Sequence, residues 1–277
     1  MPKSGHINDF HDYVSDLKKN EATFKVEFSG NSRIVHLLDA YGETIRKRLF
    51  FGYENDERMK GLEFIPMVRR EIRKQLKEGL SVPEYVEGVR VVKFDSNNLK
   101  KAAESGKTLH EVDLNACYWV TAHKLGFISK ELFQKGWKKR RECKLGLVAS
   151  IGSLNKQTYI EHYEYGKSHG MKKDDKDHDL QPFYWAVINE VSRIMESTIE
   201  KLPKHHFMMW LTDCVYIQKE SLELVESHFS ELGFEHKKNT CHISNIQPNR
   251  VFWVNHKTGE EKYIFYSKQM DVAYVEK

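Results

Sequence analysis

The sequence predicts an α+β protein in which an antiparallel sheet carries helices on one face. Segments of alternating polarity, typical of strands, are interspersed with segments of helical periodicity. The strand segments are typical of hairpin and antiparallel neighbours, which favours the α+β class. With 277 residues, 40% of them hydrophobic, the chain is long enough to bury a core without a disulfide or metal to hold it together.

Residues 1–105 are expected to form an N-terminal α+β region. Residues 1–20 are polar and helical in character, and residues 23–28 alternate as a strand does. Residues 66–79 predict a helix with an apolar stripe of Val68, Ile72 and Leu76. The rest of that helix is basic, through Arg69, Arg70, Arg73, Lys74 and Lys77. Such a surface is either a solvated face or a contact for a phosphate backbone.

Further along the chain, apolar and helical segments continue to alternate. The expected elements are a strand over 109–115, helices over 116–125 and 130–139, a helix starting near Arg141, a charged loop over 172–179, a helix over 181–201, a strand over 207–218, a helix over 221–232 and a hairpin over 250–266.

Composition narrows the class of protein further. The net charge of +4 is too small to identify a nucleic-acid binder. No stretch of 18 apolar residues occurs, so we expect no membrane span. The first residues lack the apolar core of a signal peptide, and the cysteines show no Cys-x-x-Cys spacing. These features predict a cytoplasmic protein with reduced thiols.

Two aspartates lie where carboxylates are costly. Asp113 ends an apolar strand segment, and Asp213 lies within the most hydrophobic strand segment of the chain. A carboxylate in a buried strand needs a partner or a metal. Two such groups on adjacent strands would suit Mg²⁺, which prefers oxygen ligands. The alternative is that each aspartate caps a turn or a helix.

The residues around these aspartates resemble motifs of family B DNA polymerases. Asp113, Asn115 and Tyr118 match motif A, closest to the protein-primed phage branch. Asp213 matches the second aspartate of motif C, although Leu211 stands where the family has the first. Lys144 and Gly152 have the spacing of motif B, while the Asn, Ser and Tyr of that motif are replaced by Val148, Ala149 and Ile151.

The resemblance implies a reduced palm over residues 106–267. It includes a short helical fingers-like insertion at about 126–180, no thumb, and a tail over 268–277. Asp113 and Asp213, with the backbone carbonyl of Leu114, would bind two Mg²⁺ or Mn²⁺ ions, which clamp the attacking and leaving oxygens of a phosphoryl transfer.

The resemblance also implies how nucleotide and DNA would bind. Lys144, Arg140 and Arg141 would hold the triphosphate, and Tyr118 with Asn115 would lie at the sugar of a deoxynucleotide. Arg250 occupies the place of the family's Lys-x-Tyr motif, which contacts the primer. Arg250, Lys138 and Lys139 would therefore contact nucleic acid.

The resemblance implies a nucleotidyltransferase of DNA replication in a phage or mobile element. Its partners would be DNA, dNTP and a protein that replaces the thumb. Two alternatives stay open. One is template-independent or protein-primed nucleotide addition, and the other is a degenerate palm that binds nucleic acid or a replication partner without catalysis. A reverse transcriptase is less expected, because no Asp-Asp pair occurs at the strand turn.

Overall fold

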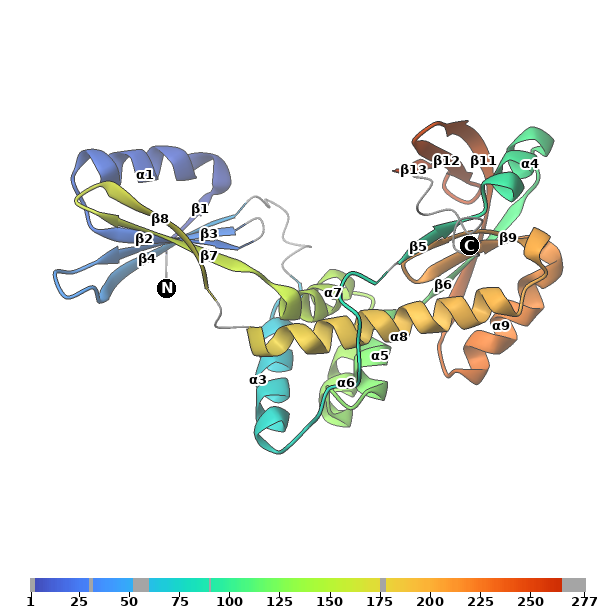
Figure 1. Cartoon of the computed structure of the whole chain (residues 1–277), viewed down its shortest axis with the longest axis horizontal. Coiled ribbons are helices and arrows are strands. Elements are labelled where there is room, and N and C mark those ends of the chain that lie inside the picture. The colour runs from blue at the N-terminus through green and yellow to red at the C-terminus, as the bar shows by residue number, and fades with distance from the viewer. Residues whose placement is uncertain (1–2, 30–31, 52–59, 90, 175–177, 266–277) are drawn as a thin grey trace. The chain divides into compact units, whose positions relative to one another are not determined.

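The computed structural model describes residues 3–29, 32–51, 60–89, 91–174 and 178–265 (Figure 1). The described chain is α+β, as predicted, with eight α-helices and two mostly antiparallel sheets. None of its helices is long and apolar enough to cross a membrane. The predicted tail over residues 268–277 lies outside the described residues.

The chain divides into two compact units, and each is built from two segments. Unit 1 comprises residues 1–81 and 134–184, and unit 2 comprises residues 82–133 and 185–277. The expected boundary at residue 105 falls inside unit 2. Most of the expected fingers-like insertion, about 126–180, belongs to the same unit as the N-terminal strands.

Unit 1 contains a six-stranded sheet in the order β1-β4-β3-β2-β7-β8. Its strands are β1 (Lys3–His6), β2 (Phe24–Ser29), β3 (Ser32–Leu38), β4 (Thr44–Phe51), β7 (Thr158–Glu164) and β8 (Lys167–Asp174). Only the β1–β4 pair is parallel within this sheet. Helix α1 (Phe10–Lys19) lies on one side of the sheet in Figure 1.

The core of this sheet follows from the alternation of its strands. Phe24 and Val26 on β2 point to the same face as Phe50 on β4, and all three are fully buried. Tyr163 of β7 stacks on Phe24 with ring centres 4.4 Å apart. Burial of each large side chain stabilises the fold by about 1.5–3 kcal/mol. The β7–β8 hairpin is therefore an integral part of the N-terminal sheet.

That hairpin corrects two expectations. The insertion was expected to be helical, but residues 158–174 form the strands β7 and β8. Strand β7 pairs with β2, and β8 is the edge strand of the sheet. Residues 172–174, expected in a charged loop, belong to β8, while residues 175–177 lie outside the described part. The reason is that β8 is almost entirely exposed and polar, so it lacks the alternation by which a strand is recognised.

Unit 1 also contains a small helical module. It consists of α3 (Phe64–Lys77), the end of α6 (Lys130–Lys138) and α7 (Lys144–Gly152). Residue 61 and α7 approach very closely, because a Cβ on Gly146 would lie 2.4 Å from the backbone of Gly61. Only glycine at position 146 permits this packing.

Unit 2 contains a seven-stranded antiparallel sheet in the order β13-β12-β11-β6-β10-β9-β5. Its strands are β5 (Val92–Phe94), β6 (Leu109–Leu114), β9 (Phe207–Leu211), β10 (Cys214–Ile217), β11 (His236–Gln247), β12 (Arg250–Asn255) and β13 (Glu261–Phe265). Its helices are α4 (Ser96–Ser105), α5 (Cys117–Lys124), most of α8 (Gln181–Glu200) and α9 (Leu222–Glu231).

The expected strand over residues 207–218 is two strands joined by a tight turn. Thr212 and Asp213 form the turn, Leu211 pairs with Cys214, and Thr212 has a positive φ of 54°. Asp213 therefore does not lie within a strand. The turn was not predicted because it contains neither glycine nor proline, and its one common turn residue, Asp213, was interpreted as a strand residue.

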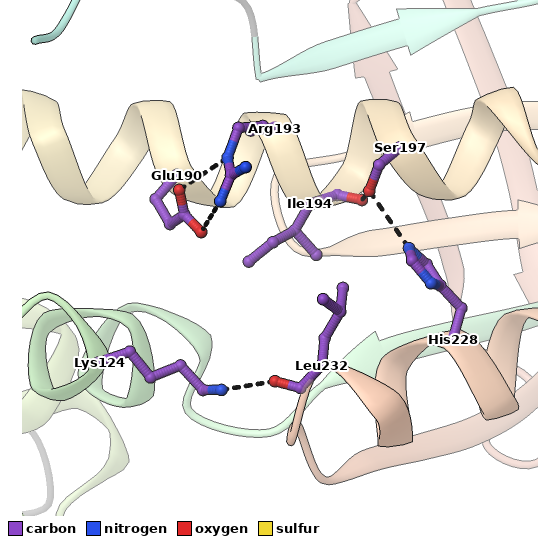
Figure 2. A network of polar contacts seen from close by, with 7 residues as sticks. All are labelled: Lys124, Glu190, Arg193, Ile194, Ser197, His228 and Leu232. Carbon is purple, nitrogen blue, oxygen red and sulfur yellow. Dashed lines mark hydrogen bonds and ion pairs between the residues drawn. The ribbon is translucent and has the colours of Figure 1, made fainter.

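A polar network fastens α8 to α9 in unit 2 (Figure 2). The Lys201 ammonium donates to Nδ1 of His228 at 2.8 Å, so Nε2 carries the ring proton and faces Ser197 Oγ at 3.2 Å. Ser197 Oγ in turn donates to the Ile194 carbonyl. Burial lowers the pKa of His228, and Lys201 lowers it further. The network therefore holds a neutral histidine as a structural link.

Candidate active site at the ends of strands β6 and β10

The two aspartates singled out in the sequence come from neighbouring strands. Asp113 is the next-to-last residue of β6 and pairs with Cys214, the residue that follows Asp213. The Leu114 N–H donates to the Asp213 carbonyl at 3.0 Å. Because adjacent strands lie about 5 Å apart, this register places both residues at the same end of the sheet.

The alternative of a turn or helix cap applies to Asp213, which lies in the turn between β9 and β10, but not to Asp113. Helix α5, which follows Asp113, has Ala116 as its N-cap, without a side-chain cap hydrogen bond. Asp213 accepts a hydrogen bond from the Thr212 hydroxyl at 3.0 Å inside the turn, which is a local bond and not a helix cap. Turn chemistry therefore accounts for part of the surroundings of Asp213, but for none of those of Asp113.

Asp113 has a cationic partner that sequence reasoning missed. The Lys237 ammonium on β11 lies 2.7 Å from Asp113 Oδ2, and the Asp113 side chain is only 18% exposed. Burial is the largest single effect and opposes the charge of Lys237, but the hydrogen bond and charge of Asp113, together with the charge of Glu111, raise the pKa of Lys237. The ion pair offsets the cost of placing a carboxylate in the sheet. Lys237 could not be predicted from the sequence, because polar and apolar residues do not alternate clearly along β11.

A third carboxylate stands beside the pair. Glu111 lies two residues before Asp113 on β6, so both side chains share one face of the sheet. Glu111 is buried, and burial together with the Asp113 charge raises its pKa. Glu111 could have been predicted from the sequence, because it lies two residues before Asp113 in a strand and therefore on the same face as Asp113.

The thiols nearby remain protonated. Burial raises the pKa of Cys117 far above its usual value, and the charge of Asp213 adds to the effect. Burial does the same for Cys214, aided by Glu111 and Asp113. Any cation held here would thus have oxygen ligands. Within the described ranges, no group of three or more His, Cys, Asp and Glu side chains is arranged to hold a metal ion.

The remaining motif A residues lie next to the carboxylate pair in unit 2. The backbone N–H of Asn115 donates to the Glu235 carbonyl at 2.8 Å, which fixes the chain after β6. Ala116 then takes a positive φ of 49° and starts α5. Tyr118 is half-buried in the first turn of this helix. The turn after β6 thus leads directly from Asp113 to Tyr118.

The predicted triphosphate and nucleic-acid residues of the insertion lie in unit 1. Lys144 is exposed at the first position of α7, and Lys138 and Arg141 are also exposed. Arg140 lies over the Trp137 ring at 4.1 Å, and Lys139 faces Glu63 at 3.6 Å. All five lie within residues 138–144 of unit 1, whereas Asp113 and Asp213 belong to unit 2.

Arg250 lies on β12 among aromatic rings. Its guanidinium is 5.3 Å from the ring centre of Tyr263 and 4.9 Å from that of Phe265. Both rings are more than half exposed, and Phe252 packs 5.5 Å from Tyr263. Exposed rings beside arginine suit stacking on nucleobases. Arg250 was predicted from the sequence, but the rings of Tyr263 and Phe265 were not. The alternation of residues along β13 was the signal that could have identified them.

The chemical capacity of the site follows from its donors. Asp113 and Asp213 offer hard carboxylate oxygens, which suit Mg²⁺ or Mn²⁺ better than softer metals. Glu111 adds a third carboxylate on the same face as Asp113. Searches with this chain against protein-family models, curated proteins and solved structures give no match.

Proposed function

We propose that the chain is a nucleotidyltransferase resembling a minimal family B DNA polymerase palm, which adds deoxynucleotides to a 3′-hydroxyl. The observation that carries this proposal is the register of β6 with β10. It sets Asp113 opposite the residue after Asp213, with Leu114 hydrogen-bonded to Asp213. This pairing supports the resemblance because the carboxylates of motifs A and C have to act together.

The carboxylate pair fits a divalent cation. Lys237 Nζ lies 2.7 Å from Asp113 Oδ2, so a divalent cation would have to displace this ammonium to reach that oxygen. Asp113, Asp213 and the Leu114 carbonyl would be the ligands. Bound Mg²⁺ or Mn²⁺ would supply activation of the attacking hydroxyl and neutralisation of the triphosphate.

The other residues have roles in binding and orientation. Tyr118 and Asn115, in the turn after β6, would contact the sugar of the incoming nucleotide. Lys144, Arg140 and Arg141 would hold its triphosphate as positive charges. Arg250 would contact the primer strand, supported by the exposed rings of Tyr263 and Phe265. Lys138 and Lys139 would contact the DNA backbone.

Primer extension tests the proposal directly. Purified protein is incubated with labelled primer–template, dNTPs and Mg²⁺ or Mn²⁺, beside the variants Asp113→Asn and Asp213→Asn. A matched control is Glu104→Gln, an exposed carboxylate on α4 of the same unit. We expect extension by the wild type and the control, and a loss of at least ~100-fold in each aspartate variant. Equal activity in all four proteins would refute the carboxylate assignment.

A second candidate is a degenerate palm that binds without catalysis. Leu211 occupies the place of an aspartate, and Lys237 neutralises Asp113. For this candidate no nucleotide is incorporated under any condition, while nucleic-acid binding is the same in wild type and aspartate variants. Product without template, or label on the protein itself, would instead indicate template-independent or protein-primed addition.

A further inference from the structure

Positive charge is concentrated in the helical module of unit 1. Residues 60–81 and 134–156 together contain 13 Lys and Arg but only 4 Asp and Glu. The whole chain has a net charge of only +4, so the rest of the chain is net acidic. This asymmetry separates the module from the remainder of the protein and indicates a surface for a polyanion.

One face of α3 collects much of this charge. The buried side of the helix consists of Phe64, Val68 and Ile72, which are all fully buried. A neighbouring face is formed by residues three or four positions apart, beginning with Glu63 and Met67 and ending with three cations. These cations are Arg70, Lys74 and Lys77.

The second segment of unit 1 extends this row. Lys139 Nζ lies 3.6 Å from Glu63 Oε1, and Lys135 Nζ lies 3.6 Å from Met67 Sδ. The two lysines therefore stand beside the first turns of α3, where the helix itself has no cation on this face. We name the resulting row the basic strip: Lys139, Lys135, Arg70, Lys74 and Lys77.

The charges of the basic strip are poorly compensated. Lys139 faces Glu63, and Lys74 lies 3.8 Å from Glu78 in a solvent-exposed pair that contributes little. Arg70 and Lys77 have no acidic partner in the part of the chain that the structure describes. Like charges spaced along one helix face repel one another. A bound polyanion would relieve that repulsion.

We propose that the basic strip binds the phosphate backbone of a nucleic-acid duplex without reading its sequence. Helix α3 has 14 residues and so extends about 21 Å, long enough to contact several phosphates along a duplex. The α3 face of the strip, from Glu63 to Lys77, contains no aromatic residue, whereas proteins that bind single strands combine cations with stacking rings. The inference shares Lys139 with the proposed function and extends its DNA contact to α3, but this binding needs neither a metal nor Asp113 and Asp213, so the two proposals can fail separately.

Binding is measured by fluorescence anisotropy with the full chain, in EDTA, on a labelled duplex of about 20 base pairs and on the single strand, over a range of salt. The strip variant carries Arg70→Gln, Lys74→Gln and Lys77→Gln, which preserve helix propensity. The matched control carries Lys100→Gln, Lys101→Gln and Lys257→Gln, three exposed lysines of unit 2. A second variant, Lys135→Gln with Lys139→Gln, leaves α3 unchanged.

We expect the strip variant to bind the duplex at least ~10-fold more weakly, with a salt slope lower by about 2–3, and the second variant to move in the same direction. The control and Asp113→Asn should bind as the wild type does, which separates this inference from the catalytic proposal. Equal loss in the strip variant and the control would overturn it, because net charge alone would then explain binding. Tighter binding of the single strand, lost in the same variants, would overturn the assignment to a duplex.

Discussion

Lys237 Nζ lies 2.7 Å from Asp113 Oδ2, across the pair formed by β11 and β6. An ammonium in this position competes with a divalent cation for the same carboxylate oxygen. The ion pair therefore stabilises the metal-free protein and would weaken the binding of a metal ion at Asp113. Lys237 is 46% exposed, so its side chain has room to move away from the carboxylate.

Replacing Lys237 by glutamine should strengthen metal binding. The substitution removes the positive charge of Lys237, which repels a metal ion at Asp113. Two charges a few ångströms apart in a partly buried site interact by about 1–4 kcal/mol, so Mn²⁺ affinity should increase about tenfold. Mn²⁺ binding is measured by electron paramagnetic resonance. Lys238→Gln is the control, because Lys238 pairs with Glu226 instead. Unchanged affinity in Lys237→Gln would show that Asp113 does not ligate the ion.

Glu111→Gln should stabilise the metal-free protein at neutral and higher pH. The pKa of Glu111 is raised in the folded protein, so folding becomes less favourable as the pH rises above the unfolded value of about 4.5 towards the folded value. Glutamine removes this penalty, on the order of 1 kcal/mol at pH 8, and should make little difference at pH 4. Urea unfolding at several pH values measures the effect, with Glu104→Gln as the control. A variant that is less stable at pH 8 would contradict the prediction.

His228 should make the protein sensitive to acid. Its pKa is lowered in the folded state, so its contribution to stability is complete above the unfolded value of about 6.5 and is lost as the pH falls below that value. His228→Asn should cost about 1–2 kcal/mol at pH 7.5 through lost hydrogen bonds, and less at pH 5.5. Thermal unfolding across this pH range measures both effects. The exposed His11→Asn serves as control, and an equal cost at both pH values would argue against a neutral His228.

Two glycines of α7 should respond oppositely to alanine. Gly146→Ala places a Cβ 2.4 Å from the Gly61 backbone and should destabilise unit 1 by about 1–3 kcal/mol. Gly152→Ala meets nothing within 4 Å and should be neutral or stabilise by up to about 1 kcal/mol, because alanine favours the helix. Calorimetric unfolding compares the two variants. Equal stability of both would mean that α7 does not pack closely against residue 61.

Elements with a local periodicity could be predicted from the sequence alone. The helices α8 and α9 and the strand β6 lie within a residue or two of their expected ranges, because an amphipathic period is visible in a short window. The sequence also identified Asp113 and Asp213, since acidic residues beside long apolar segments stand out by their cost. The basic face of α3 was equally visible as a pattern of charge.

Which segments pair, and which groups surround the charged side chains, depends on contacts between residues far apart in the sequence. The pairing of β7 with β2, the turn at Thr212 and Asp213, and the contact of Lys237 with Asp113 all join residues far apart in sequence or lack a local signal. The same holds for Lys135 and Lys139, which lie beside α3 only after folding. Strand partners and ion pairs depend on hydrogen bonds and burial across the whole unit, so short-range periodicity does not specify them.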